Sequence, residues 1–237
     1  MGNTLTCSNP KMKSVTFSYD DGVTQDIRLI ELLNKYGLKC TFNLNSELLS
    51  KRGMLIREGK RIAQYKVHAE DVKAIYEGHE VAVHTLTHPN LTQRDEAEVI
   101  RQVETDRLNL SELVGYEVVG MAYPCGGVNN DDRVADIIRK HTSVKYSRTI
   151  TTTGSFDLQE NLYRFNPTVY HLHFEKMMQL AEAFVELKPE TPKVFYIWGH
   201  SYEMDYEADY WIKLEAFFKL ISNREDIFYG TNKEVLL

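Results

Sequence analysis

The chain has 237 residues, of which 43% are hydrophobic and 26% are charged, as is ordinary for a soluble globular protein. Its net charge of −6 argues against a nucleic-acid-binding protein, which normally carries a basic excess. No apolar run reaches the roughly 18–20 residues that span a bilayer, so we expect neither nucleic acid nor membrane as a partner.

The beginning of the chain, up to Ser14, contains no apolar segment of the signal-peptide type. The three cysteines, Cys7, Cys40 and Cys125, are odd in number and widely spaced, which predicts reduced thiols rather than a disulfide framework. Both features predict a cytoplasmic protein. A chain from which an export signal had been removed would look the same.

Short apolar segments of strand length alternate with helical patterns along the whole chain. In chain order, we expect strand 14–19, helix 26–36, strand 39–44, helix 69–78, strand 79–84, helix 92–114, strand 117–123, helix 131–140, strand 143–147, helix 174–187, strand 193–198, helix 207–222 and strand 226–230. This alternation favours an α/β fold with a parallel sheet and helices outside it. The length is close to the ~250 residues of a (β/α) barrel.

Two of the helices have clear sequence signals. The helix over 26–36 carries apolar residues at helical spacing and a glycine near its end: Ile27, Ile30, Leu33, Leu38 and Gly37. The helix over 92–114 is predicted to begin at Thr92, an N-cap residue with an acid three positions later.

Residues 51–66 depart from the alternation. They are predicted to form a β-hairpin that turns at Glu58 and Gly59, and they contain six basic residues against one acid. Since charge runs mostly form solvated surfaces, we interpret this segment as a basic surface insertion. The alternative is a rim that meets an anionic or sugar substrate.

Four polar motifs each follow an expected strand: "SYDDG" (residues 18–22), "HTLTH" (84–88), "YPCGG" (123–127) and "WGHSYE" (198–203). The carboxyl ends of parallel strands share one face of the protein, where catalytic groups gather. The four motifs are therefore expected to meet in space.

His84 and His88 are four residues apart, a spacing that can direct two imidazoles at one metal ion. Thr85 stands where metalloprotease helices carry glutamate, and Pro89 disfavours a helical His88, so the pair is expected on a loop. Two surface histidines are the alternative. Their position after a buried strand favours a site in which one carboxylate and two imidazoles bind a zinc-like ion.

Asp20 and Asp21 could form nothing more than a turn, because Asp and Gly are common turn residues. Neighbouring residues in extended backbone point to opposite sides, so we expect the two carboxylates to have different tasks. One would bind the metal, and the other would receive a proton from the water that the metal activates.

The remaining two motifs each allow more than one interpretation. The "YPCGG" turn could be only a turn, could direct the Cys125 N–H at a developing oxyanion, or could present Cys125 as a nucleophile. His200 could be a core histidine or the acid that protonates a leaving group. Four other histidines are interpreted as surface or structural residues: His68, His79, His141 and His171. His173 could line the rim.

In this order the four motifs resemble the polysaccharide deacetylase family (carbohydrate esterase family 4), over roughly residues 13–230. The resemblance implies a distorted (β/α) barrel of about seven parallel strands, with residues 1–237 as a single catalytic domain. It also implies a divalent metal, commonly zinc and sometimes cobalt or nickel, and hydrolysis of an N- or O-acetyl group on a sugar or oligosaccharide.

The family pattern further implies a role for each matching residue. Asp20 would be the base, Asp21, His84 and His88 the metal ligands, and His200 the acid. In the expected mechanism, water loses a proton to Asp20 and attacks the acetyl carbon, and the metal and the Cys125 N–H stabilise the oxyanion. His200 then protonates the leaving amine or hydroxyl.

Two features depart from the family pattern. Many members carry an arginine two residues before the proline of the third motif, where this chain has Ala122; Arg148 or Arg164 are the candidate replacements. The motif that contributes an aspartate and a tryptophan has only a weak candidate, Asp157. Two other functions therefore stay open: hydrolysis of a non-sugar amide, such as a cyclic ureide or imide, and carbohydrate binding without catalysis.

Overall fold

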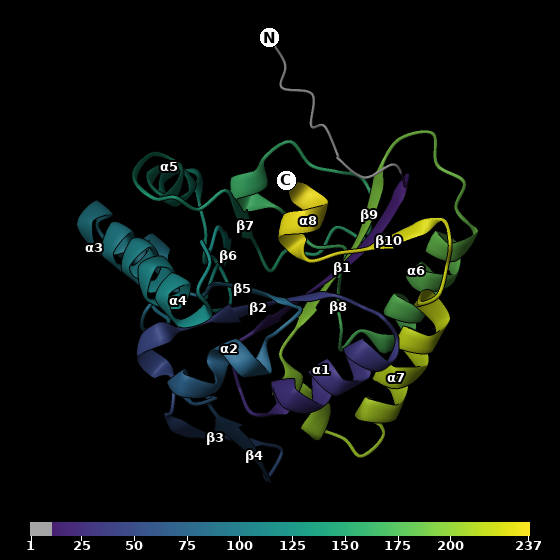
Figure 1. Ribbon diagram of the computed structural model, residues 1–237, viewed down its shortest axis with the longest axis horizontal. Helices are drawn as coiled ribbons and strands as arrows, with labels where there is room; N and C mark the ends of the chain where they lie inside the picture. Colours follow the sequence, from purple (N-terminus) through teal and green to yellow (C-terminus); the bar gives the residue numbers. More distant parts are fainter. Residues whose placement is uncertain (1–10) are drawn as a thin grey trace.

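The computed structural model describes residues 11–237, and its centre is a parallel sheet that curls into a half-barrel (Figure 1). The sheet has the order β7-β6-β5-β2-β1-β9-β8, with β10 paired to β1 off this path. Its strands are β1 (Lys13–Asp20), β2 (Cys40–Leu44), β5 (Glu80–Val83), β6 (Gly120–Ala122), β7 (Tyr146–Arg148), β8 (Val169–Tyr170), β9 (Lys193–Gly199) and β10 (Ile227–Tyr229). The predicted distorted (β/α) barrel is confirmed.

Strand β1 lies at the centre of the sheet. Every one of its eight residues is buried, as expected for a parallel strand covered on both faces. One edge of β1 pairs with β9 along nearly its whole length. The other edge pairs with β10 near its amino end and with β2 near its carboxyl end. Its last residue, Asp20, therefore emerges in the middle of the carboxyl edge of the sheet.

Helices surround the strands, with α3, α4 and α5 on one side and α6 and α7 on the other (Figure 1). The helices are α1 (Gln25–Lys35), α2 (Val72–Ile75), α3 (Glu96–Ile100), α4 (Asp106–Val114), α5 (Asp132–His141), α6 (Phe174–Glu186), α7 (Tyr210–Ile221) and α8 (Asn232–Leu236). Within residues 11–237, no helix combines the length and the apolar character that crossing a bilayer requires. Cys40 and Cys125 are free thiols, as predicted, and Cys7 lies outside the described residues.

The predicted helix over 92–114 is wrong in its start. The Asn90 side chain accepts from the Thr92 N–H (3.0 Å) and holds Thr92 in a short 3₁₀ turn, so the helical segment begins after Asp95, which caps the Glu98 N–H at 2.9 Å. A wider, π-helical turn at 101–105 then joins α3 to α4 without a break, and the helical segment ends at Val114 as predicted. In α1, Ile27 is 45% exposed and Leu29 is buried instead.

The basic segment forms the predicted hairpin, with β3 (Arg52–Arg57) and β4 (Lys60–Tyr65) paired antiparallel. Glu58 and Gly59 both have positive φ (50° and 78°), the conformation that two-residue hairpin turns require. The hairpin is a separate two-stranded sheet that projects beyond the barrel (Figure 1).

Candidate active site

The carboxyl ends of β1, β5, β6 and β9 meet around one cavity of about 220 Å³. Residues from all four motifs line it: Asp20, Asp21, His84, His88, Tyr123, Cys125, Gly126, Trp198, His200 and Tyr202, together with Ile150. The predicted convergence of the motifs is confirmed.

The backbone around this cavity is strained. Four of its non-glycine residues have left-handed φ angles, namely Asp21 (84°), Thr85 (69°), His88 (61°) and Cys125 (70°). Such conformations cost of the order of 1–3 kcal/mol each and concentrate at functional sites. The loop conformation predicted for His88 is correct.

The three predicted metal ligands lie together. One ligand atom from each of Asp21, His84 and His88 lies within 4.8 Å of the others, and Asp21 Oδ1 is 3.8 Å from His88 Nε2. The Ala122 carbonyl lies 2.9 Å from His84 Nδ1 and accepts its proton. This bond leaves the lone pair of His84 Nε2 directed at the cavity, as in histidines that bind metals.

The protonation states suit a metal site, because bound metal needs neutral imidazoles and an ionised carboxylate. Burial lowers the pKa of His84 to about 4 and also lowers that of His88. Burial favours the protonated form of Asp21, but the charges of Lys66 and the nearby histidines outweigh it and hold its pKa below the usual range. One carboxylate and two imidazoles, with room for other ligands, fit a catalytic Zn²⁺.

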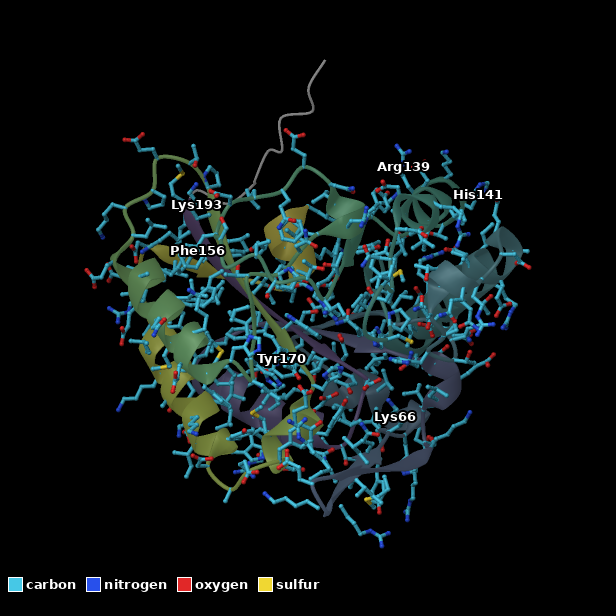
Figure 2. The ribbon with its side chains drawn as sticks, turned by 180° about the vertical axis from the view of Figure 1, so that it is seen from behind. Lys66, Arg139, His141, Phe156, Tyr170 and Lys193 are labelled. Atoms are coloured by element: carbon cyan, nitrogen blue, oxygen red, sulfur yellow. The ribbon has the colours of Figure 1, made fainter. Side chains whose placement is uncertain are left out.

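Lys66 is a site residue that the sequence analysis missed. Its Nζ donates to the Asp21 carbonyl at 2.6 Å and lies 3.2 Å from Asp21 Oδ1. Lys66 follows β4, at the base of the hairpin (Figure 2). The interpretation of residues 51–66 as a solvated insertion is therefore wrong at its carboxyl end.

Asp20 pairs with Arg148, which is fully buried and whose Nη2 contacts both carboxylate oxygens at 2.5 Å. Burial opposes ionisation, but the charges of Arg148, His84 and His200 outweigh it and lower the pKa of Asp20. Arg148 stands on β7 directly opposite Ala122 of β6. Of the two residues expected to replace the arginine missing at Ala122, Arg148 on the neighbouring strand is the one that pairs with Asp20.

The second candidate for the arginine, Arg164, and the candidate for the missing aspartate, Asp157, both lie elsewhere. Arg164 pairs with the exposed Asp132 at 2.6 Å, on the outer surface. Asp157 pairs with Lys193 at 2.6 Å and is also exposed, so it does not supply the missing aspartate. Trp198, which lines the cavity, packs its ring 4.7 Å from the Arg148 guanidinium carbon.

Asp20 and Asp21 do have different partners, but strand alternation is not the reason. Asp21 leaves the extended conformation, and both carboxylates line the same cavity. Asp20 Oδ2 is 4.0 Å from His84 Nε2 and 3.9 Å from His200 Nε2. Asp20 is therefore next to the ligand cluster and faces His200.

His200 is held between two acids. Its Nε2 faces Asp20, and its Nδ1 lies 3.2 Å from Glu203 Oε2. Burial disfavours the imidazolium, but Glu203, Asp21 and Asp20 outweigh it and raise the pKa of His200 to about 9. His200 is thus protonated at neutral pH. Glu203 was not predicted, although it lies within the "WGHSYE" motif, three residues after His200.

A buried network extends behind Glu203. Glu203 Oε2 lies 2.6 Å from His171 Nε2, and His171 Nδ1 lies 3.0 Å from the Tyr19 hydroxyl. The Tyr170 hydroxyl also donates to Glu203. A side chain at Gly199 would collide with the His171 ring, with its Cβ 2.3 Å from Cδ2. His171 is structural, as one of the two interpretations had it, but it supports the acid and has no surface exposure.

Cys125 does not have the environment of a nucleophile. Burial raises the pKa of its thiol, and Sγ donates to the His88 carbonyl at 3.4 Å. Within residues 11–237, no acceptor forms a hydrogen bond with the Cys125 N–H. The thiol is protonated, and Cys125 lines the cavity.

The remaining histidines lie outside the cavity. His79 is structural, since its Nδ1 accepts from the Cys40 N–H at 3.2 Å. His141 is on the surface, 3.5 Å from Glu96 (Figure 2). His173 precedes α6 and contacts the Tyr170 ring. It is not among the residues that line the cavity.

Comparison with known proteins identifies the family of the chain. The polysaccharide deacetylase family model matches residues 8–143. The peptidoglycan-N-acetylglucosamine deacetylase PgdA of Listeria monocytogenes is 27% identical over 120 residues, which are 49% of this chain and 22% of PgdA. The match therefore spans less than a quarter of that relative's length.

Solved structures share the fold. Puue allantoinase has a TM-score of 0.72 at 11% identity, over 99% of this chain and 93% of the allantoinase. BA3943 of Bacillus anthracis, a CE4 family pseudoenzyme, has a TM-score of 0.57 at 19% identity, over 97% of this chain and 66% of BA3943. At these identities the likeness concerns the fold alone.

Proposed function

This chain belongs to the polysaccharide deacetylase family, and from that premise we propose that it is a metal-dependent hydrolase that removes acetyl groups from a sugar or oligosaccharide. The single observation that carries the proposal is the arrangement of two pairs around one cavity. An ionised Asp20 on Arg148 faces a protonated His200 on Glu203, and three unprotonated ligand groups lie beside them.

Asp21, His84 and His88 would hold the cation, zinc being the ion that their chemistry suits best. A divalent cation bound there supplies a Lewis acid and a water of lowered pKa. Asp20 accepts the proton of the attacking water, because Arg148 keeps its carboxylate ionised.

The other two groups act on the substrate. The Cys125 N–H donates to the carbonyl oxygen of the acetyl group as that oxygen gains negative charge. His200 then gives its Nε2 proton to the departing amine or hydroxyl, which releases acetate. Its pKa of about 9 keeps that proton available at neutral pH.

The cavity agrees with a small acyl group as the part of the substrate that enters. Its volume of about 220 Å³ is below the roughly 300–1,000 Å³ of pockets that enclose drug-sized ligands. An acetyl group and part of one sugar ring fill such a space, while further sugar units stay on the surface.

One experiment tests the proposal: acetate release from chitooligosaccharides and from acetylated xylan, with and without a chelator. We expect release that the chelator abolishes and that added Zn²⁺ restores. Release that is unaffected by complete removal of metal would contradict metal dependence.

A second candidate is the hydrolysis of a small non-sugar amide, for which the size of the cavity is the supporting observation. A cyclic ureide or imide fits the same volume whole. Metal binding without acetate release from any sugar, but with turnover of a cyclic ureide, would favour this candidate. Sugar binding without turnover of either substrate would indicate a protein that only binds carbohydrate.

A further inference from the structure

Backbone hydrogen bonds join the hairpin of residues 51–66 to the turn that follows β1 at residues 21–24. The Thr24 N–H donates to the Tyr65 carbonyl at 2.8 Å, and the Val67 N–H donates to the Gly22 carbonyl at 2.9 Å. The Lys66 ammonium adds its bond to the Asp21 carbonyl. Because these bonds reach Asp21 and the residues that follow it, the base of the hairpin and the candidate ligand form one structural unit.

One face of the hairpin packs against the protein. Leu55 and Ile62, which lie opposite each other on β3 and β4, contact a buried cluster that contains Val23, Tyr202 and Tyr206. Tyr202 also lines the active-site cavity. The hairpin therefore rests on the rim of the cavity.

A row of side chains connects the catalytic acid with the hairpin. The His200 and Tyr202 rings lie 5.1 Å apart, and the Tyr202 and Tyr206 rings lie 6.3 Å apart. The Arg57 guanidinium stacks on Tyr206, with its carbon 4.2 Å from the ring centre. Arg57 is exposed to solvent, yet this stack gives it a defined position relative to His200.

Most of the positive charge of the hairpin is not neutralised by ion pairs. Of its six basic residues, only Lys60 and Lys66 form ion pairs within residues 11–237, with Glu207 and Asp21. Arg57 stands directly opposite Lys60, whose charge Glu207 neutralises, so within residues 11–237 Arg57 is the cation on this face that has no ion pair. An anion that binds this surface neutralises positive charge that the protein leaves unpaired, although the chain as a whole has a net charge of −6.

We infer that this hairpin is a recognition arm for glycan substrates that carry a carboxylate or phosphate near the acetyl group. Arginine forks bind both anions through paired hydrogen bonds, which lysine cannot reproduce. The inference rests on the proposed function and deepens it, because it names the class of sugar that the site selects. The occupant is the substrate itself, since the hairpin is bonded to the turn that carries Asp21.

The test compares two acetylated oligosaccharides of equal length, one neutral and one with a carboxylate on the acetylated sugar. The arm variant, Arg57→Gln, removes the arginine that stacks on Tyr206 and shares a face of the hairpin with Leu55, and it leaves Lys66 in place. The matched control, Arg61→Gln, removes an exposed arginine from the opposite face of the same hairpin, where Arg61 pairs with Ile56.

We expect the wild-type protein and the control to prefer the charged oligosaccharide in kcat/KM, and the arm variant to lose that preference by about tenfold. Turnover of the neutral oligosaccharide stays unchanged in all three proteins. The preference also declines as salt is raised from about 0.05 M to about 0.5 M, because screening weakens exposed charges most.

Equal kcat/KM for both oligosaccharides in wild type and arm variant would overturn the inference and leave the proposed function intact. If neither oligosaccharide releases acetate, the proposed function fails, and equilibrium binding of the two compounds to wild type and arm variant decides the inference separately. Arm-dependent binding to phosphatidylglycerol vesicles, without discrimination between the oligosaccharides, would overturn it in favour of a membrane surface.

Discussion

Two buried polar clusters lie toward opposite ends of the sheet, and they differ in how their groups are satisfied. Toward the amino ends of the strands, the Glu80 carboxylate accepts from the Thr41 hydroxyl (2.7 Å), the Tyr146 hydroxyl (2.8 Å) and the Lys233 N–H (3.0 Å). Each oxygen of Glu80 has a protein partner within hydrogen-bond distance.

At the carboxyl ends, the corresponding distances are too long for hydrogen bonds. Asp21 Oδ1 and His88 Nε2 are 3.8 Å apart, and Asp20 Oδ2 is 4.0 Å from His84 Nε2. These groups face a shared space instead of each other. Burial alone therefore does not mark a functional cluster; ligand atoms that converge without bonding to one another do.

The largest effects are expected in the cluster at the carboxyl ends of the strands, where Asp20 and His84 have separate roles. Asp20→Asn should lower kcat by between about 10²- and 10⁴-fold and leave metal binding intact, because the carboxylate acts on a proton. His84→Ala should remove the metal itself. Acetate release and metal content of the purified variants measure both, and equal metal loss in the two variants would contradict these roles.

Arg148→Met tests the charge that supports the base. The variant leaves a buried carboxylate unpaired, so the free energy of unfolding should fall by about 3–5 kcal/mol. The pKa of Asp20 should rise, which moves the acidic limb of the pH–rate profile to higher pH, since the base must be ionised. Urea denaturation and the pH profile measure the two effects. Arg139→Met, which removes an exposed ion pair with Asp136, is the control and should change stability by less than about 0.5 kcal/mol.

Glu203→Gln tests the support of the acid. The Glu203 charge helps to raise the pKa of His200 to about 9, so without it the imidazolium loses its proton at lower pH. The alkaline limb of the pH–rate profile should move down, and kcat near pH 8 should fall by up to about 10²-fold. Glu215→Gln, which removes a surface partner of Lys35, should leave the profile unchanged. An unshifted alkaline limb in Glu203→Gln would argue that His200 is not the acid.

The smallest effect on turnover is expected in the other cluster. Glu80→Ala leaves the Thr41 and Tyr146 hydroxyls without their acceptor, which should cost about 1–3 kcal/mol of stability. kcat and metal content should stay at the wild-type values, because Glu80 is not part of the active-site cavity. Thermal unfolding measures the loss of stability, and acetate release measures kcat. A change in kcat would show that the two clusters are coupled.

The sequence by itself determined the elements whose signals are local. Strand and helix alternation predicted the barrel, and each motif after a strand predicted a contribution to one face, because the carboxyl ends of parallel strands lie together. Asp20, Asp21, His84, His88, Cys125 and His200 all line the cavity as a result.

Only the tertiary structure decided which distant groups complete the site. Arg148 replaces the arginine missing at Ala122 because the register of β6 and β7 places the two positions opposite each other. Lys66 and His171 reach Asp21 and Glu203 through hairpin docking and strand packing. Contacts between residues far apart in the chain depend on strand register and on how whole elements pack, and neither leaves a periodic signal in the sequence.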